Sequence, residues 1–124
     1  MKKFLLPLFC LMLLLSVSCS KDTLTNTVWL NVDSVVMTNG DFVSSDSITL
    51  DFVDNQSAHY KKVHTTKYSN TTERATFFYT YTDGHGQFSI KSTYDFEVVG
   101  NTMLVRHAND TTSDTIVFNK IYSE

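Results

Sequence analysis

The chain has 124 residues and a formal net charge of −3, and removing the two lysines near its start lowers that charge to −5. About a hundred residues follow the N-terminal apolar stretch, which is enough for one domain with one hydrophobic core. The acidic balance and the lack of a basic patch in the sequence argue against a nucleic-acid-binding protein.

The segment Met1 to Cys19 has the layout of a secretory signal peptide. It begins with two lysines, continues with the apolar run Phe4 to Leu15, and ends with the small residues Ser16-Val17-Ser18. The apolar run is well short of the roughly 20 residues that a membrane-spanning helix needs. We therefore predict a signal peptide over residues 1–18 and no permanent transmembrane span.

Two processing routes fit the end of this segment. Val17-Ser18-Cys19 resembles the lipobox of bacterial lipoproteins, with Ser16 where that family most often has Leu. By this resemblance, cleavage precedes Cys19 and its sulfur receives a diacylglycerol. In the other route, ordinary cleavage after Ser18 leaves Cys19 as a free thiol, which is unfavourable in an exported protein. We therefore expect lipid attachment at Cys19.

The rest of the N-terminal region follows from that choice. Cys10 leaves with the signal peptide, so the mature chain has no disulfide. A lipoprotein N-terminus carries several acyl chains, and two or more chains anchor a protein stably. We predict that residues 19–25 are the modified cysteine and a short polar tether, and that residues 26–122 form the domain. The expected location is the cell envelope, at the outer membrane, on either of its faces.

The remaining sequence predicts an all-β domain. Thr, Val, Tyr, Phe and Ile are abundant, and no stretch repeats apolar residues at helical spacing. Two polar segments separate strands: Asp41–Asp46 is expected to be a loop or a short edge, and Lys67–Glu73 contains an expected hairpin loop. The eight predicted strands are Thr27–Val36, Ile48–Phe52, Ser57–Thr65, Ala75–Thr82, Gln87–Lys91, Tyr94–Val98, Met103–His107 and Asp114–Ile121.

Short connections between these strands predict their arrangement. Asn39-Gly40 and Gly100-Asn101 are strong turn signals, and strands joined by such turns favour an antiparallel, up-and-down order. About eight strands with one buried face can close into a barrel, which removes the exposed edges. Phe78 lies opposite the apolar face of its strand, so we expect that strand to be covered on both sides.

Five short motifs stand out in the predicted domain. They are Leu24–Trp29 (LTNTVW), Ile48–Phe52 (ITLDF), Tyr94–Val98 (YDFEV), Gly100–Leu104 (GNTML) and Thr115–Ile121 (TIVFNKI). Together these motifs resemble those of the small lipocalin-like lipoproteins of Bacteroidota-type bacteria. The resemblance implies a single lipocalin-like barrel and assigns no activity.

Trp29 receives two opposite predictions. Alternation along its strand turns Val28, Leu30 and Val32 inward and leaves Trp29 outside. By resemblance to lipocalin-like barrels, a tryptophan on the first strand closes the floor of the barrel. The two readings place the same indole on opposite faces.

The aromatic residues allow either a packed interior or a ligand-binding mouth. Many large rings can fill a barrel that is just wide enough for side chains or one small ligand. In the second case the hydroxyl groups of Tyr60, Tyr79 and Tyr81 line the mouth and suit a small amphipathic ligand. Together with Trp29, these three tyrosines are the candidate ligand-binding residues.

No metal, cofactor or catalytic site is predicted. His59 and His64 are an odd number of residues apart, so they point to opposite faces of one strand, and no second cysteine remains for a zinc site. The carboxylates are scattered, and the sequence contains no nucleophile elbow or phosphate-binding glycine loop. We therefore predict that the protein is not an enzyme.

Two functions remain. The first is a lipid-anchored envelope protein that binds a small amphipathic ligand. The alternative is an interaction or accessory protein with a packed barrel that contacts an envelope protein partner. A cavity above about 300 Å³ would favour the first, and an exposed apolar patch of several hundred Å² would favour the second.

Overall fold

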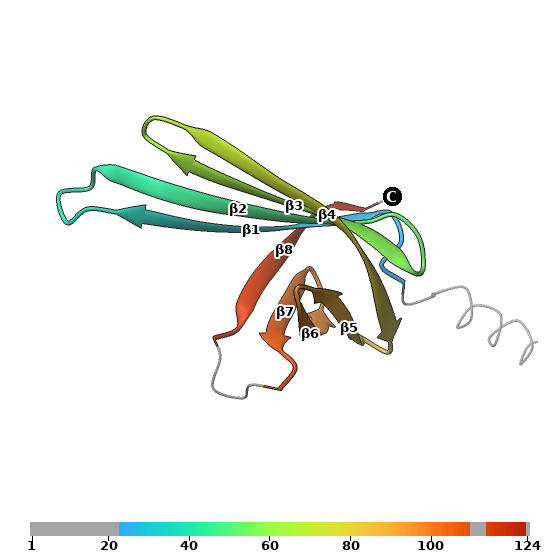
Figure 1. Ribbon diagram of the computed structural model, residues 1–124. Helices are drawn as coiled ribbons and strands as arrows, with labels where there is room; N and C mark the ends of the chain where they lie inside the picture. The colour runs from blue at the N-terminus through green and yellow to red at the C-terminus, as the bar shows by residue number, and fades with distance from the viewer. Residues whose placement is uncertain (1–22, 110–113, 124) are drawn as a thin grey trace, which may run out of the picture.

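A computed structural model describes residues 23–109 and 114–123, and these residues form a closed antiparallel barrel of eight strands in chain order (Figure 1). This confirms the predicted all-β, up-and-down barrel. The described residues contain no helix long and apolar enough to cross a membrane. The strands are β1 (Thr27–Val36), β2 (Phe42–Phe52), β3 (Ser57–Thr66), β4 (Asn70–Thr82), β5 (His85–Ile90), β6 (Ser92–Val99), β7 (Thr102–His107) and β8 (Ile116–Ser123).

The turns form where the sequence supplies residues that accept positive φ. Asp83 and Gly84 connect β4 to β5 with φ values of 52° and 83°. Two consecutive positive φ values suit a tight hairpin between strands with right-handed twist, and Asp-Gly is a preferred pair for it. The barrel is therefore built from local hairpins, each of which places the next strand beside the previous one.

The core lies inside the barrel and is mainly aromatic. Phe52 has edge-to-face contacts with Phe77 and Tyr79, at centroid distances of 6.1 and 4.9 Å. Such pairs add to the stabilisation that burial of each ring provides. The buried hydrophobic side chains are Leu24, Trp29, Leu50, Phe52, Ala58, Phe77, Tyr79, Phe88, Phe96, Met103, Val105 and Phe118.

Trp29 belongs to this core, so the alternation along its strand predicted the wrong face. Its side chain is 0% exposed, whereas Val32 is 57% exposed. The face is decided by pairing, because Trp29 lies opposite buried Leu50 on β2. The indole Nε1 donates a hydrogen bond to Thr27 Oγ1 at 2.9 Å. The Thr27 hydroxyl in turn donates to the Leu24 carbonyl, so the buried polar atoms of the floor are paired.

The first four strands are longer than the barrel. β1 pairs with β8 only over Thr27–Leu30, and β4 pairs with β5 only over Tyr79–Thr82. Asn31 ends the first of these ladders, since its Nδ2 donates to the Val117 carbonyl oxygen at 2.8 Å. Beyond these points β1–β4 continue as a four-stranded sheet that projects past the barrel (Figure 1). We call this part the overhang.

The structure corrects three sequence predictions, two of them in the overhang. Residues 42–46 belong to β2 and residues 70–73 belong to β4, where we had expected loops or a short edge. Residues 44–46 and 70–73 are polar and the sheet there has solvent on both faces, so no alternation marks them as strands. Phe78, expected to be covered, is 76% exposed on the outer face of β4, where none of the described residues buries its ring.

Candidate functional site

The barrel has an opening at the end where the overhang begins, and we call this opening the mouth. It holds a cavity of about 340 Å³. Apolar side chains form its floor and wall, and polar side chains form its rim. The apolar lining comprises Ile48, Leu50, Phe88, Ile90, Val105, Ile116 and Phe118, and the polar lining comprises Tyr60, Lys62, Glu73, Lys91, Ser92 and Tyr94.

Strand register explains why the polar residues meet there. Ile48 on β2 pairs with Lys62 on β3, which pairs with Glu73 on β4. These three residues form one cross-strand row on the inner face. This row is two residues closer to the overhang than the row that contains buried Leu50. At this level β4 has already separated from β5, and Lys91, directly after β5, reaches across the gap to Glu73. The distance from Lys91 Nζ to Glu73 Oε1 is 2.8 Å.

This ion pair shifts the pKa values of its two members. The hydrogen bond and the positive charge from Lys91 lower the pKa of the Glu73 carboxyl, and the same pair raises the pKa of Lys91. Burial raises the pKa of the Tyr60 hydroxyl, and the negative charge of Glu73 adds to that effect. The rim therefore combines the Glu73–Lys91 ion pair with Lys62 and a Tyr60 hydroxyl that can donate a hydrogen bond.

The four residues suggested by the sequence do not come together at one site. Tyr60 lines the mouth. Trp29 lies fully buried in the core. Tyr79 and Tyr81 lie at the opposite end of the barrel, where they line a separate hollow of about 380 Å³.

The tyrosines at that end have structural contacts of their own. Tyr79 donates a hydrogen bond to the Asp54 carbonyl oxygen, and burial followed by the charge of Asp54 raises its pKa. The ring of Tyr81 stacks on Phe96 at 5.9 Å. Buried Leu24 lies beside this hollow. We call this the closed end, and it is the end at which the chain enters β1.

Sequence reasoning did not identify Lys62, Glu73 or Lys91 as site residues. One signal was present, because Lys62 follows Tyr60 on the same face of a strand and a cation on an inner face is unusual. The contact of Glu73 with Lys91 carries no such signal. It depends on the separation of β4 from β5, which is a property of the closed barrel.

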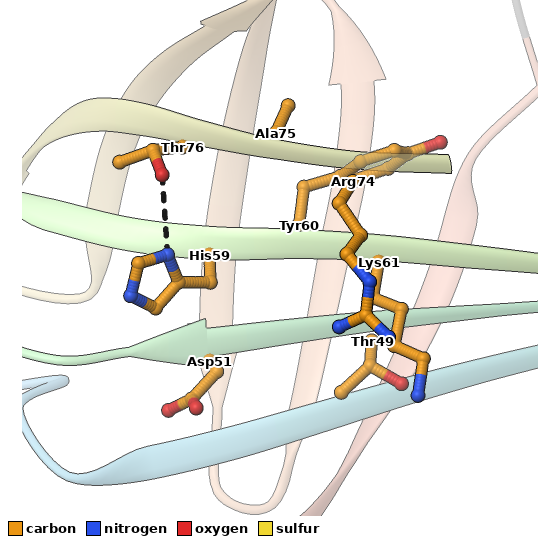
Figure 2. A pocket seen from close by; sticks show the side chains of 8 residues that line it. All are labelled: Thr49, Asp51, His59, Tyr60, Lys61, Arg74, Ala75 and Thr76. Atoms are coloured by element: carbon orange, nitrogen blue, oxygen red, sulfur yellow. Dashed lines mark hydrogen bonds between the residues drawn. The ribbon is translucent and has the colours of Figure 1, made fainter. Parts of the chain in front are cut away.

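Another hollow, of about 500 Å³, lies on the sheet formed by β2, β3 and β4, and Figure 2 shows it. Its polar lining comes from Thr49, Asp51, His59, Lys61, Arg74 and Thr76, with Tyr60 and Ala75 completing it. His59 Nδ1 is 3.2 Å from Thr76 Oγ1. Because Lys61 and Arg74 alternate with the mouth residues Lys62 and Glu73, this hollow lies on the outer face of the barrel wall. We call it the outer groove.

The histidines follow the predicted split between faces. His59 lines the outer groove, whereas His64 pairs with Asp46 on the inner face of the overhang, with 2.6 Å between Nδ1 and Oδ1. Within residues 23–109 and 114–123, no three histidine, cysteine or acidic side chains are grouped so that they could hold a metal ion.

The described residues define a small closed antiparallel barrel whose mouth holds a ligand-sized cavity. The chain matches no protein-family model, and neither a search of curated proteins nor a search of solved structures found a similar protein. The predicted signal peptide and the lipid-attachment residue Cys19 lie outside the described residues.

Proposed function

We propose that this protein is a lipocalin-like lipoprotein of the cell envelope, anchored at the outer membrane through Cys19, that binds a small amphipathic ligand in the mouth of its barrel. The observation that carries this proposal is the division of the mouth into an apolar floor and a charged rim. Its volume of about 340 Å³ is at the lower end of the range for small-molecule sites. No catalytic step is part of the proposal.

The rim indicates the chemistry of the ligand's polar end. Lys62 and Lys91 both lie beside Glu73, so two cations face one carboxylate. The surplus positive charge favours a ligand with an anionic group, such as a carboxylate. The Tyr60 hydroxyl can donate a further hydrogen bond to that group, while the apolar part of the ligand contacts Ile48 and Ile116.

The orientation of the mouth is compatible with a membrane anchor. The chain enters β1 at the closed end, beside buried Leu24, and the mouth is at the other end of the barrel. A short tether that ends at residue 25 would hold the closed end near the membrane. The mouth would then open away from the membrane, toward ligands in the surrounding aqueous space.

Native mass spectrometry tests the ligand. The chain from Ser20 onward, which contains every strand of the barrel, is incubated with a lipid and metabolite extract of its host and compared with two variants. Ile116→Trp adds an indole inside the mouth and is expected to remove the bound mass. Val117→Trp places the same group at the next residue of β8, where the side chain is 43% exposed, and is expected to retain it.

Two results would contradict binding in the mouth. One is a bare mass for the unmodified chain across several extracts. The other is a bound mass that Ile116→Trp retains but Tyr81→Ala removes, because Tyr81 lines the hollow at the closed end.

The lipid anchor has a separate test. Cells grown with a labelled fatty acid should incorporate the label into the full-length protein and should keep the protein in the outer-membrane fraction. Cys19→Ala is expected to remove the label and release the protein from the membrane. Cys10→Ala serves as the matched control, because that residue lies in the segment we expect to be removed. Equal labelling of both variants would refute attachment at Cys19.

An exposed apolar surface favours a second candidate function, contact with an envelope protein. The surface lies at the far end of the β1–β2 hairpin, and we call it the tip. Within residues 23–109 and 114–123, no strand pairs with the second side of β1 beyond Leu30, so its backbone groups there are open to another strand. The tip residues, 38–59% exposed, are Val32, Val35, Val36, Met37, Phe42 and Val43.

The open edge indicates the form of such a partner. A partner segment in extended conformation could pair with β1 and cover Val32 and Val36. A photo-crosslinking residue at Val36 in living cells should then give a discrete product, and Val32→Lys should abolish it. A crosslinker at Tyr68, which is 89% exposed on the neighbouring hairpin, is the control. Equal products at both positions would exclude the tip, and a product of twice the chain's mass would identify a second copy.

A further inference from the structure

Two like charges face each other on the outer side of the barrel wall. Lys61 on β3 lies directly opposite Arg74 on β4, and both side chains are exposed. Like charges in directly opposed positions of a sheet are destabilising. The pair therefore has a cost in the folded protein, and the fold gives no structural reason for it.

Every other lysine or arginine of the described residues has a favourable neighbour. Lys62 and Lys91 lie beside Glu73. Arg106 lies opposite Asp95, Lys120 lies 5.2 Å from the ring centroid of Trp29, and Lys67 lies 6.0 Å from that of Tyr68. Lys61 and Arg74 form no ion pair within the described part of the chain, where the salt bridges are His64–Asp46 and Lys91–Glu73.

The two cations are arranged to face one ligand. Figure 2 shows both side chains extending toward β2, where Thr49 lies. Thr49 is the direct neighbour of Lys61 in the β2–β3 ladder, so its hydroxyl adds a hydrogen-bond donor to the two charges. Asp51 is the carboxylate in the groove. It lies opposite His59, one step along the strands, and its side chain in Figure 2 points away from the two cations.

We propose that Thr49, Lys61 and Arg74 form a binding site for the phosphate group of a polar ligand. The planar guanidinium of Arg74 can donate two parallel hydrogen bonds to phosphate oxygens, Lys61 supplies a second positive charge, and Thr49 supplies a hydroxyl donor. The groove of about 500 Å³ is lined mostly by polar residues but also exposes their carbon atoms, so it suits a ligand that carries both hydroxyl groups and C–H surfaces. A phosphorylated sugar, free or as a lipid headgroup, has this chemistry.

The site is separate from the mouth although it uses the same strands. Lys62 and Glu73 are the chain neighbours of Lys61 and Arg74, and they point to the inner face. A phosphate group bound outside would therefore leave the mouth open. Failure of one site in an experiment does not imply failure of the other.

Nuclear magnetic resonance of the chain from Ser20 onward tests the site with inorganic phosphate as the probe. We expect saturable shifts of the backbone amides of Thr49, Lys61 and Arg74, compared with sodium chloride at the same ionic strength. The double variant Lys61→Gln, Arg74→Gln should weaken the affinity by about tenfold or more. Lys67→Gln removes one charge from the loop between β3 and β4, outside the groove, and should leave the affinity unchanged. Equal affinity of the double variant, or no saturable shift, would overturn the proposal.

Two further probes distinguish the sources of the phosphate. Glucose 6-phosphate should shift the same amides if the ligand is a free sugar phosphate. Vesicles of phosphatidylglycerol should sediment the unmodified chain, and not the double variant, if the ligand is a lipid headgroup. Binding of either probe that the double variant retains would place the site elsewhere and refute it.

Discussion

The ring of Phe96 on β6 lies against the backbone of Gly86 on β5, so closely that a methyl group on Gly86 would clash with the ring and with the Thr80 carbonyl oxygen. On the other side of Gly86, Tyr81 lies directly opposite in the β4–β5 ladder. The rings of Tyr81 and Phe96 are parallel within 9° at 5.9 Å. One residue without a side chain thus lets two rings from different strands stack across a third strand.

Gly86→Ala is expected to destabilise the protein by about 1–3 kcal/mol, because the added methyl forces the Phe96 ring or the β5 backbone to move. Urea unfolding followed by circular dichroism measures the change. Ser89→Ala, at an exposed position of the same strand, should change stability by less than about 0.5 kcal/mol. Equal stability of Gly86→Ala and the unmodified chain would show that the barrel accommodates the methyl.

Trp29→Ala is expected to cost about 3–5 kcal/mol of unfolding free energy, since it empties the floor of the barrel. Trp29→Phe should cost less, because it keeps most of the packing and loses the hydrogen bond to Thr27. Val28→Ala, next in the chain and on the other face, is the control for strand propensity. A loss at Val28 as large as at Trp29 would contradict the assignment of Trp29 to the floor.

The Glu73–Lys91 pair should be visible in a pH titration. Since the pKa of Glu73 is lowered below its ordinary value of 4.5, the pair adds stability above that pH. The contribution is lost as the pH falls through the lowered pKa, and it is small because both side chains are exposed to solvent. Nuclear magnetic resonance should show the Glu73 pKa rising in Lys91→Gln. An unchanged pKa in that variant, with Lys67→Gln as control, would refute the contact.

Arg74→Glu should raise stability by about 0.2–1 kcal/mol, because it replaces a repulsive pair with Lys61 by an attractive one. The same substitution at Arg106 should lower stability, since that residue lies opposite Asp95. Thermal unfolding of the two variants provides the comparison, and Arg74→Glu should also lose phosphate binding. A fall in stability for Arg74→Glu would mean that Arg74 has a structural role.

Much of the architecture could be predicted from local sequence. Thr27–Val36 was predicted with the bounds that β1 has in the structure, and the last strands were placed to within about two residues of β7 and β8. Turn residues and alternation were sufficient because the barrel is an ordered series of hairpins. Each hairpin is specified by residues close together in the chain.

Two segments, residues 42–46 and 70–73, could not be recognised as strands. A strand can be recognised from its sequence when one face is buried and the other is exposed, because apolar and polar residues then alternate. Both faces of the overhang are exposed to solvent, so this alternation is missing there. What identifies these segments is pairing with neighbours, for example Asp46 with His64. Pairing between strands is not visible in the residues of one segment alone.

By itself, the sequence determined the class of fold, the order of the strands and most of their bounds, since these depend on local preference and turns. Tertiary structure decided which face of β1 is buried and which polar residues meet. Trp29 is inside because the β1–β2 register places it opposite buried Leu50. Glu73 contacts Lys91 because β4 and β5 are no longer paired at the level of these two residues. Lys61 and Arg74 lie directly opposite each other because of the register between β3 and β4. Each of these contacts joins residues of different strands, so its physical basis is the pairing and arrangement of the strands in the folded protein.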